Sequence, residues 1–220
     1  AQLKRRYPER RFQPLLSDEQ YGFKARTHFV GRSRELTRLN QKWLSASESR
    51  VVLIQGLAGL GKTALAAEVV NLWHNRFDLV LVVQSRGYAM NAVDFYKRID
   101  LLLVRLSEYY NQDCQGNESR KIFQHEDVPD RHEIMRENLL DVLENYPILL
   151  IIDNFETNLL SDPKKGSVCQ DPEWTELLTA FVTRLQGQSR VMMTSRHRPV
   201  VWVDKVLWLP LGPLPMNEAW

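Results

Sequence analysis

The sequence predicts an α/β domain in which a five-stranded parallel sheet lies between two layers of helices. Short, almost wholly apolar runs alternate along the 220 residues with longer segments whose apolar residues recur at helical spacing. The apolar runs lack the polar alternation of half-exposed strands, which is typical of strands buried on both faces of a parallel sheet. With 44% hydrophobic residues, the chain is long enough to bury one sizeable core of this kind.

Five apolar runs are predicted to form the strands of this sheet. They are residues 51–55, 79–83, 147–152, 190–194 and 205–209. In an open α/β sheet, ligands bind at the edge formed by the carboxyl ends of the strands. Asp153, which directly follows the third run, is therefore expected at the ligand end of the sheet.

Five helices are predicted around the strands. Ser33 is expected to cap the first of them, whose apolar residues face one side. The others are expected to begin near Lys62, to include residues 95–106, and to begin at Asp130 and at Asp171. Residues 111–129 and the acidic stretch 162–166 are predicted to be loops.

The two ends of the chain are predicted to lie outside the sheet domain, which we assign to residues 28–215. Residues 1–40 contain ten Lys and Arg against four Asp and Glu, although the net charge of the chain is only +2. We interpret residues 1–27 as a basic linker or arm, and nucleic-acid binding through this arm is the less favoured alternative. Because the chain starts with Ala-Gln, we expect a piece of a longer protein, in which residues 216–220 begin a following helical domain.

Composition excludes several classes of protein. No apolar run approaches the roughly 20 residues that cross a bilayer, and the N-terminus lacks the apolar core of a signal peptide. We therefore expect a cytoplasmic protein with no membrane partner. The two cysteines, Cys114 and Cys169, lack C-x-x-C spacing, so neither a cysteine metal site nor a disulfide framework is indicated.

The strongest functional motif is GLAGLGKT at residues 56–63, which fits the spacing G-x-x-x-x-G-K-[ST] between a predicted strand and a predicted helix. Gly56, Gly59 and Gly61 can adopt backbone angles that let the loop wrap around a phosphate with its N–H groups pointing inward. The start of the following helix adds unpaired N–H groups and the positive end of its dipole. The motif thus predicts a nucleotide-binding P-loop rather than a chance glycine turn.

Within this motif, Lys62 is expected to bridge the β- and γ-phosphates and the Thr63 hydroxyl to hold Mg²⁺. Asp153, which closes the third predicted strand, would be the second metal ligand, and the alternative is a turn or capping residue. Three more residues of the loop and helix start complete the predicted nucleotide-binding set: Ala58, Leu60 and Ala64.

Two further groups are needed for phosphoryl chemistry, one to orient water and one to stabilise the developing charge. Asn154 and Glu156 are candidates for the first role, and we favour Glu156 because only a carboxylate accepts a proton at neutral pH. Arg196, just past the fourth strand, is predicted to contact the γ-phosphate as a sensor. Arg198 competes for this role, and for Glu156 and Arg196 a solvent-facing surface position is the plain alternative.

The base is expected to be adenine, and the cofactor therefore ATP or ADP. Guanine-specific P-loop proteins usually carry an N-K-x-D signature, and this chain has none. Val30, Gly31 and Arg32 lie at the start of the first predicted helix, just before the P-loop strand. We expect them to supply backbone and stacking contacts to the base.

Taken together, these motifs resemble one family, the signal-transducing STAND ATPases in the NB-ARC and NACHT-like branch of the AAA+ lineage. The matching motifs are FVGRSREL at 29–36, the P-loop, residues 149–156, MTSR at 193–196 and the exit motif at 209–219. The resemblance implies the strand order 5-1-4-3-2, which places the strand before Arg196 between the P-loop strand and the Asp153 strand. It also brings Pro213 of the exit motif to the nucleotide.

The resemblance implies an ATP/ADP switch that rests with ADP and self-associates with ATP when a ligand engages a sensor. An effector domain would precede the module and the sensor would follow it. Many relatives carry a second Asp where Asn154 stands, so we expect slow hydrolysis in which Glu156 substitutes. Two alternatives keep the same core: an AAA+ ATPase that acts on nucleic acid, and a small-molecule kinase, for which the sequence shows neither an acceptor pocket nor lid arginines.

Overall fold

The structure is a computed structural model that describes residues 29–45, 49–85, 87–111, 131–164, 166–201 and 205–214, without the side chains of 103–111. Several predictions lie outside these residues: the basic arm at 1–27, most of the loop at 111–129, the cap at Asp130, and residues 216–220. The described segments contain the P-loop, every predicted strand and every predicted site residue.

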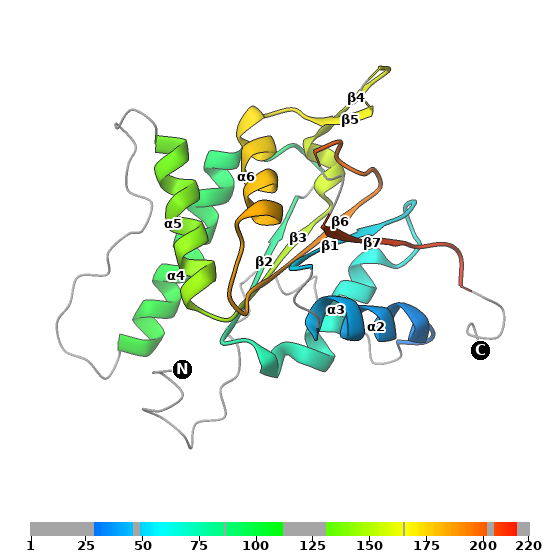
Figure 1. Cartoon of the computed structure of the whole chain (residues 1–220), viewed down its shortest axis with the longest axis horizontal. Coiled ribbons are helices and arrows are strands. Elements are labelled where there is room, and N and C mark those ends of the chain that lie inside the picture. The colour runs from blue at the N-terminus through cyan, green and yellow to red at the C-terminus, as the bar shows by residue number, and fades with distance from the viewer. Residues whose placement is uncertain are drawn as a thin grey trace.

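Five parallel strands form the central sheet, as predicted. They are β1 (Val51–Gln55), β2 (Leu79–Gln84), β3 (Ile148–Asp153), β6 (Arg190–Ser195) and β7 (Val206–Pro210). The sheet order is β2-β3-β6-β1-β7, as Figure 1 shows. This order confirms the one implied by the family resemblance, and it places β6 between the P-loop strand and the strand that ends in Asp153.

Helices cover both faces of this sheet (Figure 1). One face carries α2 (Ser33–Leu39), a π-helical turn (Asn40–Leu44) and α3 (Lys62–Trp73), and the other carries α4 (Ala92–Asn111), α5 (Arg131–Asn145) and α6 (Pro172–Thr183). Side chains alternate along each strand: Val52 and Ile54 pack in the core beneath α3, whereas Val51 and Leu53 pack in the core beneath α4 to α6. Among the described helices, none combines the length and the hydrophobicity that a membrane span requires.

A buried polar cluster joins the three helices of the second face. The Glu173 carboxylate near the start of α6 accepts hydrogen bonds from Arg136 of α5, at 2.8 Å to each oxygen, and from the Tyr96 hydroxyl of α4 at 2.7 Å. Burial and the neighbouring carboxylate raise the pKa of Tyr96, so the phenol stays a donor. The cluster links α4, α5 and α6 to one another and so stabilises the helical layer that covers this face of the sheet.

Two local features differ from the predictions. Residues 163 and 164 of the stretch predicted to be a loop do form a turn, but this turn joins two strands that were not predicted, β4 (Leu159–Asp162) and β5 (Gly166–Cys169), which pair as an antiparallel hairpin. Ser33 is the first residue of α2 rather than its cap. The N-cap position belongs to Arg32, whose left-handed backbone (φ 64°) begins the helix without a side-chain cap bond.

Candidate functional site

The loop between β1 and α3 has the geometry of a phosphate cradle. Gly59 and Gly61 adopt φ values of 80° and 85°, and a Cβ added at either position would meet nothing within 4 Å. Gly61 is also the N-cap of α3, and its carbonyl accepts the first helical bond from Leu65 at 2.8 Å. A loop with left-handed glycines directs successive N–H groups to one side, so it fits a phosphate group.

Gly56 is needed for a different reason from the one predicted. Its φ lies outside the left-handed region, unlike those of Gly59 and Gly61. A Cβ at Gly56 would lie 3.0 Å from the Leu211 carbonyl oxygen and 3.3 Å from the Leu211 Cβ. The first glycine of the loop is therefore required by close packing against the segment that follows β7.

The Lys62 side chain lies within the loop itself. Its Nζ donates to the carbonyl oxygens of Gly56 and Leu57 at 2.9 and 3.1 Å, and the residue is buried. Burial lowers the pKa of Lys62, and the negative charges of Glu156 and Asp153 oppose that shift. A charged amine held beneath the phosphate loop by neutral carbonyls is positioned to bind an anion that enters the loop.

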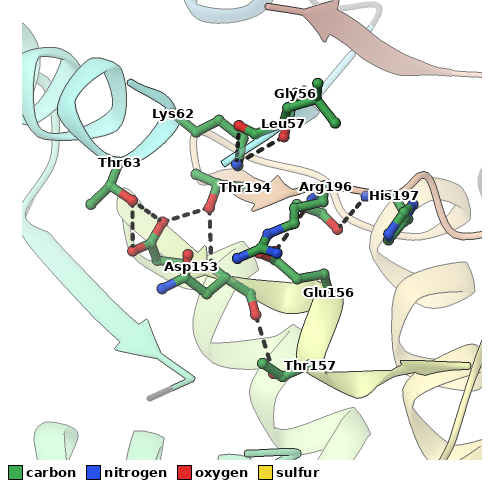
Figure 2. Close-up of polar contacts among 12 residues, drawn as sticks. Gly56, Leu57, Lys62, Thr63, Asp153, Glu156, Thr157, Thr194, Arg196 and His197 are labelled. Carbon is green, nitrogen blue, oxygen red and sulfur yellow. Dashed lines mark hydrogen bonds and ion pairs between the residues drawn. The ribbon is translucent and has the colours of Figure 1, made fainter. Parts of the chain in front are cut away.

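Thr63 and Asp153 form the second half of the cradle (Figure 2). The Thr63 hydroxyl lies 3.0 and 3.1 Å from the two carboxylate oxygens of Asp153, and Asp153 is fully buried. A hydroxyl and a carboxylate at this distance from each other match the oxygen ligands that Mg²⁺ takes from a P-loop protein. The residues present thus fit the metal that the fold implies.

Two residues that the sequence analysis missed hold Asp153 in place. Thr194 of β6 donates its hydroxyl to the Asp153 carboxylate and accepts a hydrogen bond from the backbone N–H of Asn154 at 3.0 Å. Gln84, the last residue of β2, donates its amide to Asp153 at 2.7 Å. Both are polar residues at the carboxyl ends of buried parallel strands, the same signal that selected Asp153, so position alone was enough to find them.

Glu156 and Arg196 lie together at the exposed side of the site. Asn154 adopts φ 60°, a left-handed conformation that asparagine tolerates better than most residues, and this turns the chain into a short 3₁₀ helix (Phe155–Asn158). The turn brings Glu156 to Arg196, whose Nε lies 3.0 Å from the carboxylate and whose backbone N–H donates to it at 3.3 Å. Figure 2 shows this pair beside the Thr63–Asp153 pair.

The competing arginine has another environment. The Arg198 guanidinium lies 5.4 Å from the centre of the Trp208 ring on the edge strand β7. A cation over an aromatic face gains electrostatic attraction there. The geometry therefore favours Arg196 over Arg198 as the cation of the site.

The residues predicted to contact the base lie where two segments meet. Val30 and Pro213 are exposed, and Gly31 adopts a left-handed backbone (φ 78°). The Arg32 side chain, in contrast, is buried and donates to the carbonyl oxygens of Leu60 and Gly212. Stacking of the Arg32 guanidinium on a base would require breaking these bonds, so only the backbone of this segment and the exposed side chains suit the predicted role.

The sheet order and the loop from β1 to α3 define a P-loop ATPase domain. A comparison with protein families gives its branch. Residues 28–214 match the family described as AAA ATPase domain, and the chain belongs to this family. The AAA+ lineage predicted from the sequence is confirmed.

Similar proteins are longer than this chain. An uncharacterized WD repeat-containing protein of Nostoc sp. is 22% identical over 171 residues, which make up 78% of this chain and 13% of that protein. Among solved structures, a STAND protein with a tetratricopeptide repeat sensor from Pyrococcus horikoshii has a TM-score of 0.55 and 21% identity, over 89% of this chain and 25% of that one. A Walker-type ATPase of Pyrococcus abyssi has a TM-score of 0.58 and 12% identity, over 89% of this chain and 57% of that one. The structural likenesses support the fold.

Proposed function

We propose that this domain is an ATP/ADP switch that binds nucleotide tightly and hydrolyses ATP slowly. The observation that carries the proposal is the ion pair between Arg196 and Glu156. Arg196 is the side chain that would contact the γ-phosphate, and Glu156 is the one that would orient the attacking water. In the ion pair, each of them is engaged by the other. A domain that holds these groups against each other is suited to sensing the third phosphate rather than to rapid turnover.

Nucleotide binding rests on the loop and on Lys62. The left-handed glycines expose backbone N–H groups, and the start of α3 adds its unpaired donors and dipole. Lys62 exchanges the carbonyls of Gly56 and Leu57 for phosphate oxygens, which are stronger partners because they carry charge. These groups reach phosphates that ADP and ATP share, so both nucleotides are expected to bind.

Thr63 and Asp153 would hold Mg²⁺ in this site. When bound, the metal neutralises charge on the β- and γ-phosphate oxygens. Thr63 must turn its proton away from Asp153 to offer a lone pair, while Thr194 and Gln84 keep the carboxylate fixed. The protein therefore supplies two oxygen ligands with little rearrangement of the backbone.

The γ-phosphate would act on the Arg196–Glu156 pair. Arg196 is about half exposed (52%) and Glu156 is largely covered (13%), so the arginine is the partner with room to move. An anion near Arg196 competes for its guanidinium and leaves the Glu156 carboxylate available to accept a proton from water. ADP lacks this third phosphate and leaves the pair intact.

Slow hydrolysis follows from the same geometry. Among the described residues, Glu156 is the one carboxylate beside Arg196 that is proposed to orient water, since Asn154 stands where the family resemblance implies an acid in many relatives. The exposed side of the site also weakens electrostatic stabilisation, which is strongest where water is excluded.

The switch would act within a longer protein. The chain covers 25% of the STAND protein from Pyrococcus horikoshii, which has a tetratricopeptide repeat sensor. By analogy, we expect an effector domain before this module, a sensor after it, and self-association in the ATP state.

A small-molecule kinase is the second candidate, because the structure contains a cavity that the sequence did not reveal. It has a volume of about 260 Å³, lies at the carboxyl end of β2 and is lined by Gln84, Ser85, Tyr88, Ala89, Met90, Asp94 and Arg98. Gln84 joins this cavity to Asp153. A kinase would consume ATP only when an acceptor is added, whereas a switch ATPase needs none.

Measurement of ADP and ATP binding together with steady-state phosphate release tests the proposal. We expect both nucleotides to bind, and phosphate to appear at well under about 1 s⁻¹, the lower end for ordinary enzymes. Turnover faster than this without an added acceptor would contradict the switch and favour a motor. Failure to bind either nucleotide would contradict the P-loop assignment itself.

A further inference from the structure

Arg32 connects three segments that are distant in sequence. Its Nη1 pairs with Glu35 at 2.8 Å, and its Nη2 donates to the carbonyl oxygen of Leu60 at 3.0 Å and to that of Gly212 at 2.7 Å. Only 5% of the residue is exposed. Leu60 belongs to the P-loop, and Gly212 belongs to the segment that leaves β7, so one guanidinium group bridges the phosphate loop and the exit of the domain.

A second, independent contact joins the same two segments. Leu211 is buried, and its N–H donates to the Gln55 carbonyl at the end of β1 at 2.6 Å. Its carbonyl oxygen and Cβ lie so close to Gly56 that a side chain there would collide with them. The exit segment, defined here as residues 211–214, thus packs against the base of the phosphate loop.

The position of Leu60 makes this bridge relevant to the nucleotide. Leu60 directly precedes Gly61, which is the N-cap of α3 and carries one of the two left-handed backbones of the cradle. A phosphate that orders the loop fixes the direction of the Leu60 carbonyl. Because the two N–H groups of one Nη2 are held in a rigid plane, a shift of the Leu60 carbonyl is passed to the Gly212 carbonyl.

We propose that Arg32 is a positioning residue that couples the P-loop to the exit segment, so that nucleotide binding at the loop orders residues 211–214. This inference rests on the proposed nucleotide binding, and it replaces the base-stacking role expected for the Arg32 side chain. In this proposal the exit segment, rather than the sheet, transmits whether nucleotide is bound at the P-loop to the chain beyond residue 214.

Hydrogen exchange with and without ADP tests this coupling. In the parent protein, ADP should slow exchange in the P-loop and in the exit segment. In Arg32→Met, which keeps the apolar stem and removes the guanidinium, ADP should slow exchange in the P-loop as in the parent but in the exit segment much less. The affinity for ADP should fall about tenfold or less, equivalent to one neutral hydrogen bond. Arg34→Met is the matched control, since Arg34 is exposed two residues away, and it should behave like the parent.

The outcomes separate this inference from the proposed function. If ADP binds and protects the P-loop but leaves the exit segment of the parent unchanged, the coupling is wrong and the nucleotide site stands. Equal protection of the exit segment in Arg32→Met would also overturn it. If the parent binds no ADP, both proposals fail. Should Arg32→Met not fold, Arg32→Lys keeps the charge without the planar fork and should show partial protection of the exit segment, and full protection there would contradict the coupling.

Discussion

The two sides of the candidate site are built differently. On the side proposed to bind the metal, the Asp153 carboxylate is fully buried and accepts hydrogen bonds from Thr63, Thr194 and Gln84, which lie on three different elements. On the side proposed to contact the γ-phosphate, Glu156 and Arg196 form an ion pair with each other, and the arginine is half exposed. On the first side, three side chains of the protein hold the carboxylate in place. On the second side, a ligand could replace one partner of the ion pair.

This difference has an energetic meaning. Removing one partner from a buried charge leaves the other charge unsatisfied, and such changes are costly. The Arg196–Glu156 pair is half exposed on its arginine side, where solvent screening keeps the contribution of an ion pair small, so a ligand can break it at little cost. The metal side is therefore suited to permanence and the γ-phosphate side to response, as a switch requires.

The largest expected effect comes from Lys62→Ala, which removes the cation beneath both sides. Binding of ADP and ATP should weaken by about a hundredfold or more, because the charged amine's contacts with the β-phosphate of both nucleotides and, in ATP, with the γ-phosphate as well are lost. Calorimetry with each nucleotide measures this. ADP affinity within a few-fold of the parent would show that the P-loop assignment is wrong.

Asp153→Asn tests the metal side. The change removes the charge at nearly constant shape, so ADP binding without Mg²⁺ should stay close to that of the parent. The tightening produced by Mg²⁺ should disappear, because the amide oxygen is a much weaker metal ligand than a carboxylate. Titrations of ADP with and without Mg²⁺ provide the comparison, and an unchanged Mg²⁺ effect would exclude Asp153 as a ligand.

Arg196→Ala tests the γ-phosphate side. Its proposed ligand is the third phosphate, so ATP affinity should fall by about ten- to a hundredfold while ADP affinity changes little. Arg198→Ala is the matched control and should leave the ratio of the two affinities unchanged. If Arg198→Ala lowers that ratio and Arg196→Ala does not, the sensor has been assigned to the wrong arginine.

The smallest effect is expected for Glu156→Gln. Release of Arg196 from the ion pair should raise ATP affinity by up to about fivefold, the equivalent of an exposed salt bridge. Phosphate release should fall at the same time, since the amide accepts no proton. Faster turnover in this variant would refute the role of Glu156.

The sequence was sufficient for the features that depend on local pattern. The apolar runs predicted the five strands, and the strand order implied by the family resemblance was correct. The P-loop motif located the left-handed Gly59 and Gly61, but it gave the wrong reason for Gly56, whose constraint comes from Leu211 far along the chain. The spacing of a motif predicts backbone conformation within the motif. It does not predict which distant segment packs against one of its residues.

The missed features share that cause. The strand order implied by the resemblance already put β2 beside β3, but the contact of Gln84 with Asp153 depends on how the side chains at the two strand ends pack. The pairing of Glu156 with Arg196 depends on the left-handed turn at Asn154. Each side chain was visible in the sequence, and two of them were selected as candidates. Their partners were decided by tertiary packing, which single-sequence patterns do not contain.

The order of the strands has a consequence for how the domain reaches its native state. β1 is the first strand of the described chain, yet both of its neighbours in the sheet, β6 and β7, come from the last part of that chain. Thr63 meets Asp153 across 90 residues, and Arg32 meets Gly212 across 180. Contacts between residues so far apart in sequence form slowly, because the entropy of the long intervening chain is lost before the contacts contribute stabilising energy. The cradle is thus complete only when folding is complete. Nucleotide at a hundred times its Kd would stabilise the fully folded state by about 2.7 kcal/mol and would not stabilise a partly folded state.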